Sequence, residues 1–162
     1  MLAIALDPSV DRLRVGARTA LRQKIANVLF VVARLEDSPC ELDGAADRIT
    51  VTFPWGSLLR GLVHADPAVL RPLARMARPG AQVEVLLSVE DRDAASGVAT
   101  ADVDRVARRR AEFLDAGLAL EGVRAAVTSD LAGTTWGKRL GVARSARVLD
   151  LRRTPPEATG SS

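Results

Sequence analysis

The stretch "TVTFPWGSLLRG" (residues 50–61) contains a change of secondary structure and one of the two tryptophans in the chain. The residues before Pro54 have the β-branched and aromatic composition of a strand. A helix is predicted from residue 57 to residue 64. A core tryptophan usually lies inside a helix or strand, whereas Trp55 stands between Pro54 and Gly56 at the end of one. We therefore expect Trp55 to be presented to its surroundings and not buried.

The composition is that of a globular protein. A chain of 162 residues, 48% hydrophobic and 27% charged, is long enough for one domain with its own core. Aromatic residues make up only 3%, so the core must consist mainly of Ala, Val and Leu. No apolar run reaches the roughly 18 residues of a membrane-spanning helix, and no signal-peptide pattern is evident. The single cysteine, Cys40, excludes an internal disulfide and a cysteine metal cluster. We expect a cytoplasmic protein.

The net charge of +3 is unevenly distributed along the chain. Residues 105–153 contain 11 basic and 5 acidic residues, which is +6, while the rest of the chain contains 12 basic and 15 acidic residues, which is −3. This asymmetry indicates that the C-terminal half faces a polyanion. The alternative, left open by the charges alone, is a set of solvated helix faces.

Apolar runs alternate with helical patterns, which predicts an α/β fold with a mostly parallel sheet. The last two strands are separated by residues 128–145, which contain no predicted helix, so this pair is expected to be antiparallel. Strands are predicted at residues 1–7, 27–35, 48–53, 81–89, 118–127 and 146–153, and helices at residues 8–26, 57–64, 67–78 and 102–116.

Three segments carry a family resemblance: "ALDPSVDRL" (5–13), "ARLEDSPCELDGAADRITVTFPWGSLLRG" (33–61) and "TTWGKRLGVARS" (134–145). In order and spacing they resemble the aminoglycoside-resistance 16S rRNA (adenine(1408)-N(1))-methyltransferases. The resemblance implies a class I (Rossmann-like) sheet and S-adenosyl-L-methionine as cofactor. It also implies methylation of ring nitrogen 1 of the decoding-site adenine in the 30S subunit. We expect one methyltransferase domain over residues 1–153 and a disordered tail over residues 154–162.

Asp7 ends the first predicted strand, where ligands of open α/β sheets bind. A carboxylate there can accept hydrogen bonds from both ribose hydroxyls of a nucleoside cofactor. The alternative is that Asp7 caps the helix that follows Pro8. The resemblance implies that Leu35 and Glu36 hold the adenine of the cofactor. It also assigns four further residues to the cofactor site: Pro8, Phe53, Ser57 and Thr134.

The resemblance matches Trp55 and Trp136 to two tryptophans that hold the target base. An enzyme that modifies a base pulls it out of its stack, and two aromatic faces can hold it, each contributing roughly 1–3 kcal/mol. An indole face also tolerates the cationic product base. This chemistry needs no histidine–carboxylate pair. We expect the two rings to face one another across a single opening, while the alternative is that both are packing residues.

Basic residues follow Trp136, and the resemblance assigns them to rRNA phosphates, which position a substrate without reading its sequence. One position departs from the family: an expected arginine is replaced by Ala146. Whether Arg147 substitutes for it stays open, because neighbouring residues on a strand point to opposite faces. The exact target is open for the same reason. The predicted RNA-binding residues are Lys138, Arg139, Arg144 and Arg147.

The family has a further first strand with a glycine-rich loop that holds the methionine part of the cofactor, and this sequence contains neither. That strand lies at the centre of the sheet, so its absence would leave rows of backbone groups unpaired. Unmade buried hydrogen bonds cost about 1–3 kcal/mol each, against a domain stability of roughly 5–15 kcal/mol. We therefore expect Met1 to be internal to a longer protein, which the upstream reading frame would test. The alternative is that residues 1–7 pair directly with residues 48–53.

Two other functions stay open at this point. The chain could be a non-catalytic remnant that binds RNA or the ribosome without cofactor. It could also be a related methyltransferase that acts on another RNA or on a small molecule, which the alanine at position 146 would favour.

Overall fold

A computed structural model describes residues 1–89, 97–131 and 146–155 of the chain. It divides into two compact units, Met1–Leu42 and Asp43–Ser162, and each is described by itself. The predicted single domain and most of the predicted tail therefore stay predictions.

The first unit is a β–α–β motif followed by a short 3-10 turn. Strands β1 (Ala3–Leu6) and β2 (Val28–Val31) pair in parallel, with Ile4 opposite Leu29. Gly16 lets the intervening helix approach the sheet, because an added Cβ would lie 3.1 Å from the ring of Phe30. Leu13 is buried on the same helix. The connecting elements are α1 (Val10–Arg22) and η1 (Cys40–Leu42).

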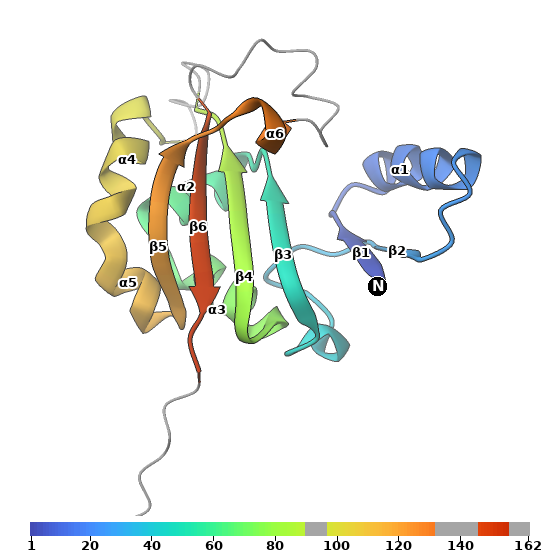
Figure 1. The fold of residues 1–162 in the computed structure, drawn as a ribbon, viewed down its shortest axis with the longest axis horizontal. Helices are drawn as coiled ribbons and strands as arrows, with labels where there is room; N and C mark the ends of the chain where they lie inside the picture. The colour runs from blue at the N-terminus through green and yellow to red at the C-terminus, as the bar shows by residue number, and fades with distance from the viewer. Residues whose placement is uncertain (90–96, 132–145, 156–162) are drawn as a thin grey trace, which may run out of the picture. The chain divides into compact units, whose positions relative to one another are not determined.

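The second unit contains a four-stranded sheet in the order β3-β4-β6-β5 (Figure 1). β3 and β4 are parallel, and β6 is antiparallel to both of its neighbours, as predicted for the final pair. The strands are β3 (Ala46–Thr52), β4 (Ala77–Leu87), β5 (Leu118–Ala125) and β6 (Arg147–Arg153).

Helices cover one face of this sheet. In Figure 1, α2 and α3 lie behind the strands, and α4 and α5 flank β5, while α6 stands at the end of β5. The alternation of β4 explains this, since Val83, Val85 and Leu87 are buried on one face whereas the alternating residues Gln82 and Glu84 lie on the other. The helical elements are α2 (Gly56–His64), α3 (Pro67–Met76), α4 (Thr100–Arg105), η3 (Val106–Arg109), α5 (Arg110–Asp115) and α6 (Thr128–Leu131).

Glycine determines how closely two of these helices pack. A Cβ added at Gly61 of α2 would lie 2.3 Å from Cγ2 of Val69 on α3. Such a distance is far inside van der Waals contact, so only glycine fits there. Because the two helices pack this closely, side chains such as Leu62 and Leu70 are fully buried in the core.

Several boundaries differ from the prediction. The helix expected over residues 102–116 contains the 3-10 turn η3 in its middle, although Val103, Val106 and Phe113 are buried as expected. The helix expected to reach residue 78 ends at Met76, because residues 77–80 already belong to β4. The strand expected over residues 27–35 ends at residue 31. Among the described residues, the strand pairings lie within one unit each, β1 with β2 in the first and β3 with β4 in the second, and the alternative pairing of residues 1–7 with residues 48–53 stays a prediction.

Candidate functional site

The carboxyl ends of three strands meet at one edge of the four-stranded sheet. β3 and β4 are parallel, and β5 runs in the same direction because both β4 and β5 are antiparallel to β6. The first residue of β6, Arg147, lies at the same edge. The connection between β5 and β6 therefore begins and ends beside the residue stretch that contains Trp55.

Trp55 is exposed at this edge. Its relative exposure is 63%, whereas the preceding Pro54 is buried. Trp55 is the N-cap residue of α2 in an extended conformation, and Gly56 follows with a φ of 59°, which favours glycine. The prediction that Trp55 is exposed is confirmed, while its contact with a base stays a prediction.

A small apolar cluster lies beneath this edge. It consists of Leu86, Ala126, Ala146 and Val148, all at most 6% exposed, with the half-buried Phe53 packed against it. The backbone N–H of Ala126 donates to the carbonyl oxygen of Ala146 at 3.0 Å. The cluster thus joins the end of β3 to both ends of the β5–β6 connection.

Five of the predicted site residues lie in the β5–β6 connection, outside the described residues: Thr134, Trp136, Lys138, Arg139 and Arg144. The neighbouring positions are described. Ala146 is fully buried in the apolar cluster. The guanidinium of Arg147 lies 3.7 Å from the carboxylate of Asp104 and donates to the carbonyl of Ala146.

In the first unit, Asp7 lies at the carboxyl end of β1, where its backbone N–H donates to the carbonyl of Val31. Its Oδ1 accepts a 2.7 Å hydrogen bond from the backbone of Ser9, and its Oδ2 lies 3.7 Å from Arg12. The N-cap of α1 is Ser9, so the alternative in which Asp7 is the N-cap is wrong. The carboxylate instead stabilises the turn that leads into the helix.

The other predicted cofactor residues differ in exposure. Leu35 is buried, and its carbonyl accepts a hydrogen bond from Ser38, whereas Glu36 and Pro8 are exposed. In the second unit, Ser57 is exposed on the first turn of α2. Asp7 and Leu35 thus follow adjacent parallel strands, and the chain beyond each strand leaves from the same edge of that pair.

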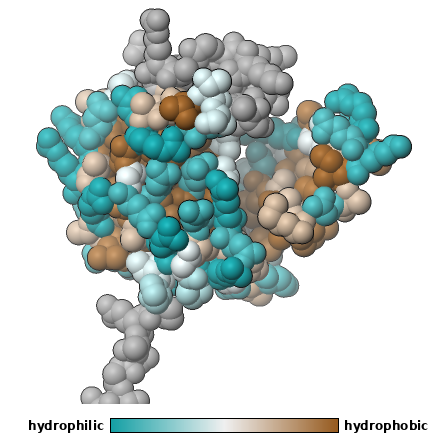
Figure 2. All heavy atoms as spheres, in the orientation of Figure 1, coloured by the Kyte–Doolittle hydropathy of each residue, from teal (hydrophilic) through white to brown (hydrophobic). Residues whose placement is uncertain are grey.

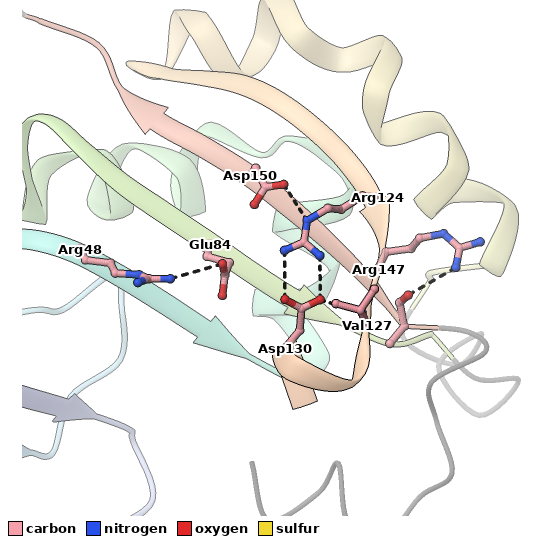
Figure 3. Close-up of polar contacts among 8 residues, drawn as sticks. Arg48, Glu84, Arg124, Val127, Asp130, Arg147 and Asp150 are labelled. Carbon is pink, nitrogen blue, oxygen red and sulfur yellow. Dashed lines mark hydrogen bonds and ion pairs between the residues drawn. The ribbon is translucent and has the colours of Figure 1, made fainter. Parts of the chain in front are cut away.

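The sequence did not reveal a charge cluster formed by Arg124, Asp130 and Asp150 (Figure 3). It lies on the open face of the four-stranded sheet, which is the face that the helices do not cover. Arg124 donates two hydrogen bonds to Asp130, at 2.7 and 3.1 Å, and its Nε donates to Asp150 at 3.1 Å. Hydrogen bonds from Arg124 and from the backbone of Val127 lower the pKa of Asp130, and those from Arg124 to Asp130 raise the pKa of the arginine. The cluster fixes α6 to β5 and β6. Sequence separation conceals it, since Asp150 lies 26 residues from Arg124.

The open face of the sheet is polar. Figure 2 shows hydrophilic side chains over the strands, and a pocket of about 340 Å³ lies among them. Arg48 and Glu84 form an ion pair of 3.5 Å at this pocket. The pocket is lined by Arg48, Thr50, Thr52, Glu84, Leu86, Ser129 and Asp130.

Among the described residues, no group of three or more His, Cys, Asp or Glu side chains has the arrangement of a metal site. None of the helices described is both long and apolar enough to cross a membrane.

Comparisons with known proteins identify the family of the chain. A family model described as NpmA, 16S rRNA (adenine(1408)-N(1))-methyltransferase, matches residues 1–154. The chain is 36% identical to the methyltransferase of that description from Streptoalloteichus tenebrarius and 30% identical to one from Escherichia coli. Each alignment spans 92 residues, 54% of this chain and 42% of the relative, so less than half of each relative's length is matched.

Solved structures give the same result. The aminoglycoside resistance methyltransferase NpmB1 has a TM-score of 0.73 and 30% identity, over 93% of this chain and 75% of that one. The 16S rRNA methyltransferase KamB has a TM-score of 0.75 and 28% identity, over 95% and 77%. A tryptophan-to-alanine mutant of the 16S rRNA (adenine(1408)-N(1))-methyltransferase from Catenulisporales acidiphilia was solved with cosubstrate SAM. It has a TM-score of 0.76 and 25% identity, over 99% of this chain and 78% of that one. The fold is that of the S-adenosylmethionine-dependent methyltransferases, and the chain belongs to the 16S rRNA (adenine(1408)-N(1))-methyltransferase family.

Proposed function

We propose that the protein methylates ring nitrogen 1 of adenine 1408 in 16S rRNA, with S-adenosylmethionine as cofactor, and so confers aminoglycoside resistance. The observation that carries this proposal is the exposed Trp55 at the edge where the β5–β6 connection begins and ends. Trp136 belongs to that connection. The family match over residues 1–154 supplies the reaction.

Trp55 and Trp136 hold the flipped adenine between their rings in this proposal. When bound, S-adenosylmethionine supplies an electrophilic methyl group. Ring nitrogen 1 carries a lone pair, so no proton has to leave before the methyl group is transferred. The protein therefore has to orient the base and stabilise the positive charge that the base acquires, which an indole face does well.

The residues of the first unit fit the nucleoside part of the cofactor. The half-buried carboxylate of Asp7 accepts one hydrogen bond from Ser9 and keeps acceptor capacity for ribose hydroxyls. Leu35 offers an apolar surface and Glu36 an exposed carboxylate for the adenine. Four more residues complete the proposed cofactor set: Pro8, Phe53, Ser57 and Thr134.

The proposed partner is the 30S subunit in the cytoplasm. Lys138, Arg139 and Arg144 would contact rRNA phosphates. Arg147 lies 3.7 Å from Asp104 in the structure, so a phosphate would have to replace that carboxylate. Such contacts predict methyl transfer that weakens with rising salt concentration.

Primer extension tests this function, because a methyl group on ring nitrogen 1 blocks base pairing and stops reverse transcriptase. The chain is incubated with 30S subunits and S-adenosylmethionine, in parallel with a chain that includes any upstream in-frame sequence. A cofactor-dependent stop at adenine 1408 is expected, and it should be lost in Trp55→Ala. Absence of the stop with both chains would reject the assignment.

A second candidate is RNA binding without methyl transfer. It is favoured by the exposed Trp55 and by the basic residues that follow Trp136, because neither needs a cofactor to contact RNA. Calorimetry separates the two functions. The methyltransferase must bind S-adenosylmethionine measurably, while the alternative predicts binding to 30S subunits and no heat with the cofactor.

A further inference from the structure

Phe53 has an unusual backbone conformation directly before Pro54 and Trp55. Its φ is 48°, in the left-handed region that bulky residues rarely adopt. Its N–H still donates to the carbonyl of Leu86 at 2.7 Å, so it extends the hydrogen-bonded edge of β3 by one residue before the chain turns away. Backbone strain of this kind persists only where the surrounding structure imposes it, and it is common at functional sites.

The ring of Phe53 supplies that constraint. It packs against the cluster formed by Leu86, Ala126, Ala146 and Val148. Two of the four cluster residues are alanines, which leave room for an aromatic ring above the sheet. A glycine at position 53 would remove the backbone strain but would also remove the contact between the ring and the cluster. The contact of the ring therefore accompanies a backbone conformation that is unfavourable for phenylalanine.

The chain between this anchor and α2 is very short. Pro54 is buried, and its own φ is fixed by its ring. Trp55 follows in an extended conformation, and α2 begins at the next residue, with Leu59 buried at 1% exposure. The direction of the exposed indole is therefore determined by Phe53 on the strand side and by α2 on the helix side.

We propose that Phe53 is a positioning residue: its left-handed backbone and its ring on the apolar cluster together hold Trp55 in place at the carboxyl edge of the four-stranded sheet. This inference deepens the proposed function, on which its catalytic consequence rests. It differs from a cofactor contact of the same side chain, because it requires Trp55 to be held in the absence of cofactor and RNA.

Fluorescence anisotropy of Trp55 tests the positioning directly. Trp136→Phe makes Trp55 the single tryptophan, and the measurement is made without cofactor or RNA. Phe53→Leu keeps a large apolar side chain, not branched at Cβ, on the cluster and should leave the anisotropy unchanged. Phe53→Gly should lower it by roughly a third, which is the difference between a rigid and a flexible segment. Unchanged anisotropy in Phe53→Gly would overturn the proposal.

Ala65→Gly is the matched control, because Ala65 also has a left-handed backbone, with a φ of 56°, at the opposite end of α2. It relieves strain without removing a ring, and the anisotropy of Trp55 should not change. A fall in anisotropy in this control would show that any relief of strain near α2 loosens Trp55, and would also overturn the proposal.

Methyl transfer to 30S subunits is the second readout, in the chain with both tryptophans. At saturating S-adenosylmethionine, where a weaker cofactor contact of the same side chain has little influence, Phe53→Gly should lower kcat/KM for 30S subunits about as much as Trp55→Ala does. Adding it to Trp55→Ala should have little further effect, since the two act as one unit. Additive losses would reject a shared role. If the unaltered protein transfers no methyl group, the proposed function fails, while the anisotropy still decides the role of Phe53.

Discussion

Trp55→Ala distinguishes a base-binding tryptophan from a core tryptophan by comparing stability with activity. An aromatic side chain buries about 150–250 Å² when fully enclosed, worth about 25 cal/mol per Å². With 63% of Trp55 exposed, about a third of that area is covered, so the free energy of unfolding should fall by about 1–2 kcal/mol. Phe113 is fully buried, and Phe113→Ala should cost about 3–5 kcal/mol.

The activity should show the opposite order. A base–aromatic stack contributes about 1–3 kcal/mol, so kcat/KM for 30S subunits should fall about 5- to 150-fold in Trp55→Ala. Trp55→Phe should recover part of the loss. Urea unfolding and single-turnover methyl transfer measure the two effects, with Phe113→Ala assayed where it is still folded. A stability loss in Trp55→Ala as large as that of Phe113→Ala, or an unchanged kcat/KM, would refute the reasoning.

Three further changes test other parts of the structure. Gly61→Ala should cost at least about 1–3 kcal/mol in urea unfolding, because the new methyl group overlaps Val69, and Val69→Ala should restore part of the loss. Asp130→Asn should cost about 1 kcal/mol at neutral pH. Since Arg124 holds the pKa of Asp130 below its ordinary value, the carboxylate stabilises the fold above about pH 4, and acidification below this should remove the difference between variant and parent. Asp7→Asn should raise the KM for S-adenosylmethionine about tenfold or more, with little change in stability, because a hydrogen bond to a charged acceptor is worth about 1.5–3 kcal/mol.

The sequence predicted those features that depend on neighbouring residues. The exposure of Trp55 followed from the proline and glycine beside it. The antiparallel final pair followed from the lack of a predicted crossover helix between the last two strands, although the connection does contain the single turn α6. Local patterns were less informative about the helix around η3. Val103 and Val106 are three residues apart, and over a single turn this spacing fits a 3-10 helix as well as an α-helix.

Features that depend on distant residues could not be predicted. Arg124 has no periodic relation to Asp150, so their contact requires the pairing of β5 with β6. The packing of Phe53 on the cluster that contains Ala146 likewise brings together parts of the chain up to about 90 residues apart in sequence. The departure of Ala146 from the family pattern was visible in the sequence, but its complete burial in the apolar cluster was not.

The antiparallel direction of β6 explains how one sheet edge can collect residues from distant parts of the chain. Had β6 been parallel to β5, its connection would have crossed from the carboxyl edge to the opposite edge, as crossover connections do. Because β6 is antiparallel, the connection begins after Ala125 and ends before Arg147 at one edge of the sheet. Trp55 follows the carboxyl end of β3 at this same edge. The hydrogen bond between Ala126 and Ala146 closes the base of that connection, and the ring of Phe53 packs on it. In the proposed function, a base held between the two tryptophans would therefore lie next to the apolar cluster, whose residues are fixed by the pairing of the strands.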